Sequence, residues 1–252
     1  MDADVFEEIP SGYYFNQILK LIIFCYEQIK NDKIQKPYRR KEILEIIKEI
    51  RKKENVQFEL EDYLRNDLVN NYISKKNLEI FKLNTFQVHP GVEVSKRNVT
   101  IGRVDIQFTS SSATSKEDFS FIFECKRLNK IKAKRRKYIE KGMMRFIEKQ
   151  YYAESNTSLA GMIAFIEIDT TKHKKGIVPV DEIVKQLKEI MREYKFQLKT
   201  TQELTFYPLL DKECNEISNF KYSYQTKHVR AEDEIEIDIH HLLLDYNDIL
   251  IS

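Results

Sequence analysis

The stretch that decides the fold is Gly102-Arg103-Val104-Asp105-Ile106-Gln107-Phe108, then a polar loop, then Phe119-Ser120-Phe121-Ile122-Phe123-Glu124-Cys125-Lys126. Both ends are rich in apolar, β-branched and aromatic residues, which is typical of strands. Residues 109–118 between them are mostly small and polar, which is typical of a turn or loop. The pattern therefore predicts a β-hairpin with Asp105 in its first strand and with Glu124 and Lys126 at the end of its second.

The charged residues of this hairpin suggest a chemistry. Glu124 and Lys126 are two residues apart on a strand, so their side chains point to the same face. Hard divalent cations such as Mg²⁺ bind carboxylate and carbonyl oxygens, and a bound ion lowers the pKa of its water. With Asp105 on the neighbouring strand, the residues predict a site for metal-assisted phosphodiester hydrolysis. The alternative is a strand end with ordinary solvated charges.

This pattern resembles the PD-(D/E)xK nuclease superfamily, which has the restriction-endonuclease-like fold. Asp105 matches the motif Asp, Glu124 the second acidic position and Lys126 the motif Lys; Val104 stands where a Pro often precedes the Asp. The resemblance covers about residues 57–194. It implies a Mg²⁺-dependent deoxyribonuclease, in which Mn²⁺ can substitute, with Asp105, Glu124 and the backbone carbonyl of Cys125 as metal ligands. It also suggests a role in restriction or anti-phage defence.

The same resemblance assigns a role to the first core helix, which we place at Phe58–Ile73. In this superfamily that helix carries a Glu that approaches the metal, and Glu61 is the candidate for this catalytic and metal-binding role, with Glu59 as the second choice. The alternative is a surface ion pair between Glu61 and Arg65 at the i,i+4 spacing.

A basic block follows the predicted site. Nine of the sixteen residues from Lys126 to Lys141 are Lys or Arg, and only Glu140 is acidic. Such a block suits a polyanion, so DNA is the expected partner and RNA is also compatible; a solvated helix face is the alternative. The candidates for binding nucleic acid are Arg103, Arg127, Arg135, Arg136, Lys141 and Arg145. Arg103 is equally compatible with an ion pair to Asp105.

Composition limits the remaining possibilities. The chain has 252 residues, of which 42% are hydrophobic and 33% charged, enough for one large domain or a core with a subdomain. Its three cysteines are far apart, so a zinc site or disulfide framework is not expected, and Cys125 should face the core. We expect a cytoplasmic protein without a membrane segment, because the longest apolar run, Leu21–Tyr26, is too short to span a bilayer.

The overall prediction is an α/β fold, a restriction-endonuclease-like mixed sheet flanked by helices. Residues 1–55 form an N-terminal helical extension, and residues 56–252 a nuclease-like domain with a C-terminal β-rich part. The extension would pack on the core, bind nucleic acid or form a homodimer. The further predicted helices are Tyr13–Lys30, Arg39–Glu54, Arg136–Ala153 and Pro179–Tyr194. The further predicted strands are Thr85–Val88, Ala160–Ile168, Thr205–Leu210, Phe220–Arg230 and Glu234–His240.

Two of these predictions depend on local signals. Pro90-Gly91 predicts a turn after the strand Thr85–Val88. Glu234–His240 alternates apolar and polar residues, which predicts a solvent-facing antiparallel strand. For the function, the rival to an endonuclease is a catalytically silent nuclease-fold protein that binds nucleic acid or a protein partner.

Overall fold

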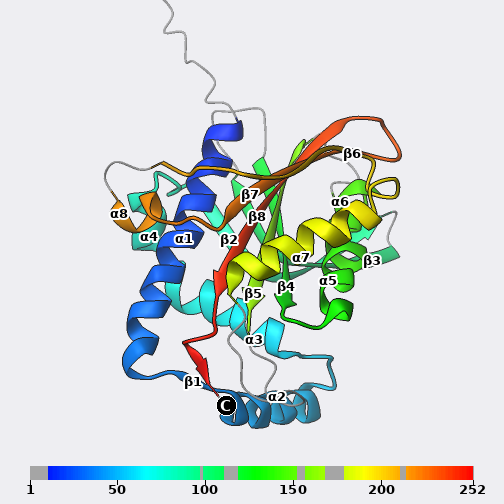
Figure 1. The fold of residues 1–252 in the computed structure, drawn as a ribbon. Coiled ribbons are helices and arrows are strands. Elements are labelled where there is room, and N and C mark those ends of the chain that lie inside the picture. The colour runs from blue at the N-terminus through cyan, green and yellow to red at the C-terminus, as the bar shows by residue number, and fades with distance from the viewer. Residues whose placement is uncertain are drawn as a thin grey trace, which may run out of the picture.

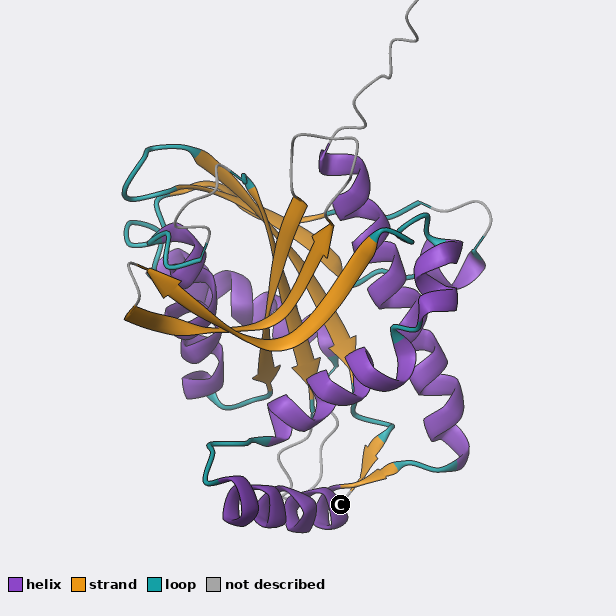
Figure 2. Cartoon of the chain, turned by 180° about the vertical axis from the view of Figure 1, so that it is seen from behind, coloured by secondary structure: helices purple, strands orange, loops and turns teal. Residues whose placement is uncertain are grey.

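The structure, a computed structural model, describes residues 11–96, 99–110, 119–151, 157–167, 179–210 and 214–251. The described residues contain a seven-stranded sheet with the strand order β2-β3-β4-β5-β8-β7-β6 (Figures 1 and 2). In chain order its strands are β2 (Phe86–Lys96), β3 (Val99–Ser110), β4 (Phe119–Leu128), β5 (Leu159–Ile166), β6 (Thr200–Phe206), β7 (Ser223–Val229) and β8 (Glu236–Asp245). Two short strands, β1 (Tyr38–Arg39) and β9 (Leu250–Ile251), pair separately in parallel.

The sheet is mixed, and its parallel part lies in the centre. Strands β2, β3 and β4 form an antiparallel meander, which includes the predicted hairpin. Strand β5 pairs in parallel with both β4 and β8, while β7 continues the sheet antiparallel to β8 and β6 antiparallel to β7. A parallel pair requires a crossover, and helices provide it between β4 and β5. The predicted mixed α/β architecture is therefore confirmed.

Helices cover both faces of the sheet and divide the core into two layers. One layer contains α1 (Ser11–Gln35), α3 (Leu60–Asp67) with the following π-helical turn η1 (Leu68–Tyr72), and α4 (Lys75–Ile80). The other contains α5 (Lys132–Tyr138), the π-helical turn η2 (Ile139–Met143), α6 (Met144–Ile147) and α7 (Val180–Glu193). Figure 1 shows α7 lying across this second face. Two further helices are α2 (Arg40–Glu54) and α8 (Asn215–Ser218).

The N-terminal helix α1 belongs to the main core. Phe15, near its start, stacks on Phe123 of β4 with the ring centroids 5.4 Å apart, and its buried residues share one hydrophobic cluster with β3, β4 and β8. An unbroken apolar stripe of this kind stabilises a helix by burial against a sheet. Helix α2 buries Ile43 and Ile47 in the same cluster, and Arg40 at its start adds a buried ion pair with Glu167. The division at residue 55 stays a prediction.

Several predicted elements differ from the structure. The turn at Pro90-Gly91 is wrong, because β2 continues through both residues to Lys96. Pro90 is tolerated there because β2 is an edge strand. The helix predicted for Arg136–Ala153 begins earlier, at Lys132, and ends at Ile147; Ala153 lies outside the described residues, as does the predicted strand end at Ile168.

The late strands also need correction. The strand predicted for Thr205–Leu210 begins five residues earlier, as β6. The prediction for Glu234–His240 is right about an antiparallel pairing, which β8 makes with β7. It is wrong about a solvent-facing strand, because β8 also pairs in parallel with β5 and is mostly buried. The C-terminal β-rich part is thus built into the sheet that carries the predicted site.

Candidate active site

The candidate site forms where the pairing between β3 and β4 ends. Their antiparallel register runs from Ser110–Phe119 to Ile106–Phe123, one residue before Asp105 and Glu124. Side chains replace the ladder at this point. The N–H of Cys125 donates to Asp105 Oδ2 at 2.8 Å, and the carbonyl of Cys125 accepts from Lys126 Nζ at 2.6 Å. Asp105 is therefore held beside Cys125 of β4, at the point where β3 and β4 stop pairing.

Lys126 lies at the centre of the site. Besides the Cys125 carbonyl, its Nζ contacts one oxygen of each of three carboxylates: Glu124 Oε1 at 2.5 Å, Glu61 Oε1 at 3.4 Å and Asp105 Oδ2 at 3.6 Å. Glu61 comes from α3, Asp105 from β3 and the rest from β4. The other three residues predicted to be catalytic, and all four predicted metal-ligating groups, are thus brought together around Lys126.

The second oxygen of each carboxylate is held by a different donor. Asp105 Oδ1 accepts from Arg65 Nη1 at 2.7 Å, and Glu61 Oε2 accepts from the backbone N–H of Arg127 at 2.9 Å. Glu124 Oε2 accepts from the hydroxyl of Tyr151 at 2.7 Å. Charge-assisted bonds of this kind are short and orient both partners. The three carboxylates therefore have fixed orientations.

The charged side chains of the site are largely shielded from solvent. Glu124 is 1% exposed, and burial, with Asp105 nearby, raises its pKa to about 7 despite the opposing effect of Lys126 and Arg145. Burial also raises the pKa of Glu61. Burial alone would lower the pKa of Lys126, but the carboxylates of Glu124, Glu61 and Asp105 outweigh it and raise that pKa well above its usual range. Lys126 is therefore an ammonium ion in this arrangement.

The predicted nucleic-acid-binding residues fall into two groups. Arg145 reaches the site, where its Nη1 lies 2.9 Å from Glu124 Oε1. Arg103 lies at its edge, with a side chain that is 41% exposed, and its ion pair at 2.6 Å is with Asp62 and not with Asp105. Of the six predicted residues, these two have side chains at the site.

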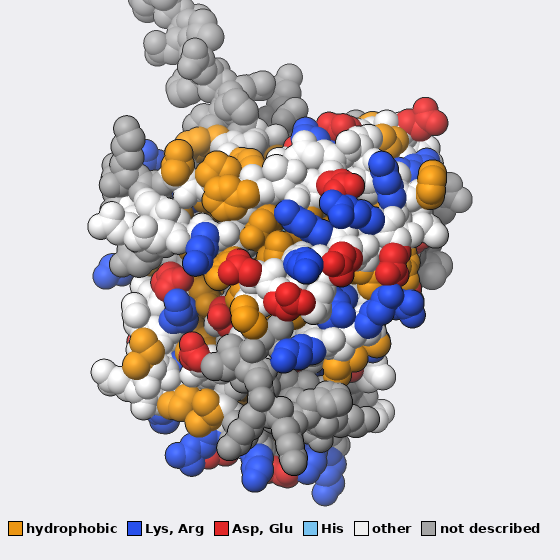
Figure 3. All heavy atoms as spheres, in the orientation of Figure 1, with side chains coloured by type: hydrophobic (Ala, Val, Ile, Leu, Met, Phe, Trp, Pro, Cys, Tyr) orange, Lys and Arg blue, Asp and Glu red, His pale blue; other side chains and the backbone are white. Residues whose placement is uncertain are grey.

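The side chains of the other four do not take part in the site, although the backbone N–H of Arg127 holds Glu61. The Arg127 side chain makes an ion pair with the buried Glu167 at 2.5 Å. Arg135 is buried and donates to the carbonyl of Asn129 at 2.9 Å. Arg136 and Lys141 are exposed, on α5 and η2 respectively. On the face seen in Figure 3, side chains of both charges are interspersed, so this face has no large area of one sign.

Two residues of the site were missed in the sequence. Arg65 contacts Asp105 and makes a second ion pair with Asp62 at 2.9 Å, in place of the considered pair with Glu61. The sequence did indicate a role for Arg65, because an Arg on the apolar side of a helix is buried only where it has an acidic partner. Tyr151 had no signal, because the sequence there predicts a continuing helix.

The donor chemistry of the site fits a divalent cation, although its present geometry favours an ammonium. Among the described residues, no group of three or more His, Cys, Asp or Glu side chains is arranged to hold a metal ion. Lys126 Nζ lies between the carboxylates of Glu124, Glu61 and Asp105. Carboxylate and carbonyl oxygens are nevertheless the ligands that Mg²⁺ and Mn²⁺ prefer, and Asp105, Glu124, Glu61 and the Cys125 carbonyl would be the ligands.

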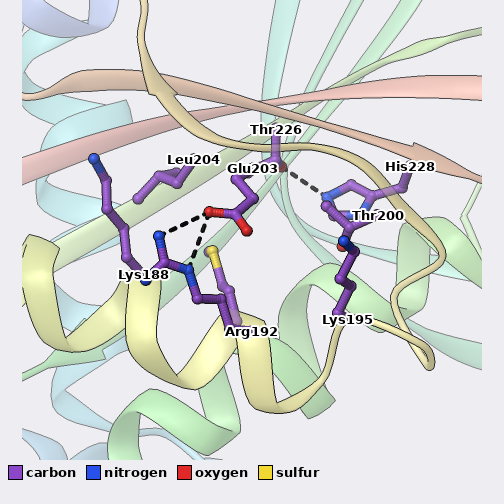
Figure 4. Close-up of a pocket in the computed structure, with 9 residues that line it drawn as sticks. Lys188, Arg192, Lys195, Thr200, Glu203, Leu204, Thr226 and His228 are labelled. Atoms are coloured by element: carbon purple, nitrogen blue, oxygen red, sulfur yellow. Dashed lines mark hydrogen bonds and ion pairs between the residues drawn. The ribbon is translucent and has the colours of Figure 1, made fainter.

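Two cavities lie elsewhere. Figure 4 shows one between α7, β6 and β7, where Arg192 pairs with Glu203 at 3.0 Å; its volume of about 10 Å³ is that of a single water. The other, of about 380 Å³, lies beside α1 and the end of β8. Neither contains a residue of the candidate site. In the described part of the chain, no helix has the length and apolar character needed to cross a membrane.

Comparison of the chain with protein-family models, with curated proteins and with solved structures finds no match.

Proposed function

We propose that this chain is a divalent-metal-dependent endonuclease that hydrolyses phosphodiester bonds in DNA. One observation carries the proposal: oxygens of Glu124, Cys125, Glu61 and Asp105 surround a single cation, Lys126 Nζ, at 2.5, 2.6, 3.4 and 3.6 Å. Carboxylate and carbonyl oxygens are the ligands that hard divalent cations bind, so this set of donors supports the proposal. A structural ion pair would need only one of them.

The order of the elements supports the same proposal. A helix (α3) precedes an antiparallel meander (β2, β3 and β4), and a helical segment then leads to the parallel strand β5. This arrangement places Asp105 and the Glu124–Lys126 pair on neighbouring strands and Glu61 above them. It agrees with the proposed restriction-endonuclease-like fold and with the resemblance of Asp105, Glu124 and Lys126 to the PD-(D/E)xK pattern.

The residues of the chain would share the work as follows. A bound ion would supply a more acidic water and neutralise charge on the phosphate. Lys126, whose ammonium already lies within 2.6 Å of the Cys125 carbonyl, would move aside and orient the attacking water. Arg145 would bind a phosphate oxygen and stabilise the charge that develops there. Arg103, at the edge of the site, would contact a neighbouring phosphate.

The test is cleavage of supercoiled plasmid, single-stranded DNA and RNA by the full chain, in Mg²⁺ or Mn²⁺ and in chelator. We expect metal-dependent cutting that Asp105→Asn and Lys126→Ala each reduce by at least about a hundredfold, since each removes a group that acts in the transition state. Lys185→Ala, which changes an exposed lysine on α7, is the matched control and should cut like the wild type.

Other outcomes identify other functions. Salt-sensitive DNA binding without cutting would point to the silent nuclease-fold protein, since counterion release makes phosphate binding weaken steeply with salt. Cutting of RNA but not of DNA would show that the substrate is RNA. Cutting that persists in chelator, or that survives in both site variants, would refute the proposed site.

A further inference from the structure

The turn after α6 brings an unpredicted residue into the candidate site. Helix α6 ends at Ile147, and Lys149 has a left-handed backbone with φ of 52°. The N–H groups of Gln150 and Tyr151 then both donate to the carbonyl of Arg145, at 2.9 and 3.3 Å. This helix-ending pattern reverses the chain. It turns Tyr151 back toward the sheet.

The turn is also held from outside. Lys149 makes an ion pair with Asp233 at 2.9 Å, and the N–H of Ala231 donates to the carbonyl of Ile147 at 2.9 Å. The Tyr151 ring packs edge-on against Phe146 with the centroids 5.2 Å apart. Tyr151 is only 1% exposed, so its hydroxyl has a defined position.

That hydroxyl connects two charged residues of the site. It receives a hydrogen bond from Arg145 Nη1 at 2.5 Å, and it lies 2.7 Å from Glu124 Oε2 and 3.1 Å from the carbonyl of Arg103. A hydroxyl has one proton to donate. The carboxylate is the closer acceptor and the stronger one, so the proton is directed at Glu124.

The three carboxylates differ in how their outer oxygens are held. Asp105 Oδ1 is held by a guanidinium and Glu61 Oε2 by a backbone N–H, whereas Glu124 Oε2 is held by a neutral side-chain hydroxyl. Removing one oxygen atom from Tyr151 would therefore free Glu124 Oε2, while Glu124 Oε1 keeps its contacts with Lys126 and Arg145 and the outer oxygens of the other two carboxylates stay held. Tyr151→Phe removes this hydroxyl, and with it the hydroxyl's contacts with Glu124, Arg145 and the Arg103 carbonyl.

We infer that Tyr151 is a positioning residue of the proposed site: its hydroxyl fixes Glu124 so that a single oxygen, Oε1, faces the position of the cation. The inference rests on the proposed function, because it assigns Glu124 as a ligand. Residues that orient metal ligands in this way commonly contribute a factor of about 10–100 to metal affinity or activity. With all three outer oxygens held, the site presents one oxygen from each carboxylate and takes one ion.

The test is a titration of Mn²⁺ with the full chain, in which electron paramagnetic resonance reports free Mn²⁺. We compare the wild type with Tyr151→Phe and Tyr26→Phe. Tyr26 is a matched control, because it is 2% exposed and its hydroxyl donates to the carbonyl of Asp245 at 2.8 Å, away from the site. We expect one Mn²⁺ per wild-type chain, about tenfold weaker binding in Tyr151→Phe, and wild-type affinity in Tyr26→Phe.

Cleavage by the same three proteins separates this inference from the proposed function. Weaker Mn²⁺ binding in Tyr151→Phe alone supports the inference, even if no nucleic acid is cut. Equal Mn²⁺ affinity in Tyr151→Phe and the wild type overturns it, even if both cut DNA. Two Mn²⁺ ions per chain, or an equal loss in Tyr26→Phe, also overturns it. A wild type that cuts DNA but binds no Mn²⁺ would refute the cation position itself.

Discussion

Lys126 balances the negative charge of the site. Its Nζ lies within 3.6 Å of an oxygen of each of Glu61, Asp105 and Glu124, and its side chain is only 13% exposed. A buried ion pair contributes little net stability compared with an apolar pair, but removal of one partner leaves the other charged and desolvated. Lys126 therefore contributes to stability as well as to the proposed chemistry.

This balance predicts a non-additive pair of substitutions. We expect Lys126→Met to lower the free energy of unfolding by about 3 kcal/mol, because it leaves Glu124 buried without its main cation. In the double variant Lys126→Met with Glu124→Gln, part of this loss should be recovered, with a coupling energy of about 1–3 kcal/mol. Urea unfolding of the wild type, both single variants and the double variant, in chelator, measures it.

A matched cycle on the surface provides the control. Arg192 and Glu203 form an ion pair with both side chains more than half exposed, and such solvent-screened pairs contribute little net stability. Arg192→Met and Glu203→Gln should therefore be nearly additive. If the buried cycle were equally additive, Lys126 would not depend on Glu124 and the described charge balance would be wrong.

At the scale of residues, the sequence predicted that the charged residues of the two strands lie together, but it did not predict the side chains that hold them. Asp105, Glu124 and Lys126 follow from alternation along two strands that are neighbours in the chain. Arg65 is 40 residues from Asp105 in the chain, and Tyr151 is 27 residues from Glu124. Such contacts depend on how a helix or a turn lies over the sheet, which local periodicity does not encode.

At the scale of elements, a close approach of β4 and β5 fixes the strand that carries the site. Phe123 of β4 lies beside Gly161 of β5 in their parallel register. A Cβ added to Gly161 would lie 2.0 Å from the Phe123 ring. The ring cannot easily retreat, because Phe15 stacks on it and Phe108 packs edge-on against it. Glu124 follows Phe123 directly, so this contact also determines where Glu124 lies.

We therefore expect Gly161→Ala to lower the free energy of unfolding by about 2–3 kcal/mol through overpacking. The double variant Gly161→Ala with Phe123→Leu should lose less stability than the sum of the losses of the two single variants, because the smaller side chain makes room for the methyl group. Thermal unfolding measures both. Ala164→Gly, in the same strand, is a control that removes a methyl group instead. Additive losses in the double variant would show that the ring is not the obstacle.

Elements with a strong period were predicted best. Helix α7 (Val180–Glu193) agrees closely with the predicted helix Pro179–Tyr194, and it buries Ile183 and Leu187 on one face. The helix after β4 was predicted to be too long, because apolar residues keep a helical spacing beyond the point where the chain turns. Its actual end depends on the left-handed Lys149, a conformation to which Gly and Asn are better suited.

At the scale of the molecule, the position of β8 could not be read from its sequence. The alternation at Glu234–His240 describes only the exposed beginning of the strand. From Ile239 to Leu244 the strand is buried and contacts both core layers. In the chain β8 follows β6 and β7, yet in the sheet it lies between them and β5, and this order is a matter of topology that local sequence does not encode. Only the apolar run Leu242–Leu244 indicates burial on both faces.

Strand β8 brings buried histidines into a directional hydrogen-bond chain. The Tyr138 hydroxyl contacts His241 Nδ1 at 2.8 Å, His241 Nε2 contacts Thr226 at 2.9 Å, and Thr226 contacts His228 Nε2 at 2.8 Å. His228 Nδ1 lies 3.0 Å from the carbonyl of Leu198, which can only accept. His228 therefore carries its proton on Nδ1, and its Nε2 accepts from the Thr226 hydroxyl. Thr226 in turn accepts from His241 Nε2–H, and His241 Nδ1 accepts from the Tyr138 hydroxyl. All of these imidazoles must be neutral.

Neutral buried histidines make the fold sensitive to acid. Burial lowers the pKa of His228 and of His240 to about 4, and it also lowers the pKa of His241. Since an unfolded histidine titrates near 6.5, unfolding takes up protons between about pH 6.5 and 4, and stability falls as the pH falls through this range. Glu124 acts in the opposite direction, because its raised pKa of about 7 lets the native state bind a proton first. The histidine contribution must therefore be isolated by substitution.

His240→Phe isolates one of these protons. The His240 ring lies 5.1 Å from Phe15 and 4.6 Å from Tyr207, so a phenyl ring should fit there and leave the stability at pH 7.5 within about 1.5 kcal/mol of the wild type. Between pH 6 and 5 the variant should lose less stability than the wild type, by about 1.4 kcal/mol per pH unit, because one proton fewer is taken up on unfolding. Urea unfolding at closely spaced pH values measures both slopes. Parallel curves for the two proteins would mean that His240 already binds its proton in the folded state, and the burial argument would then fail for β8.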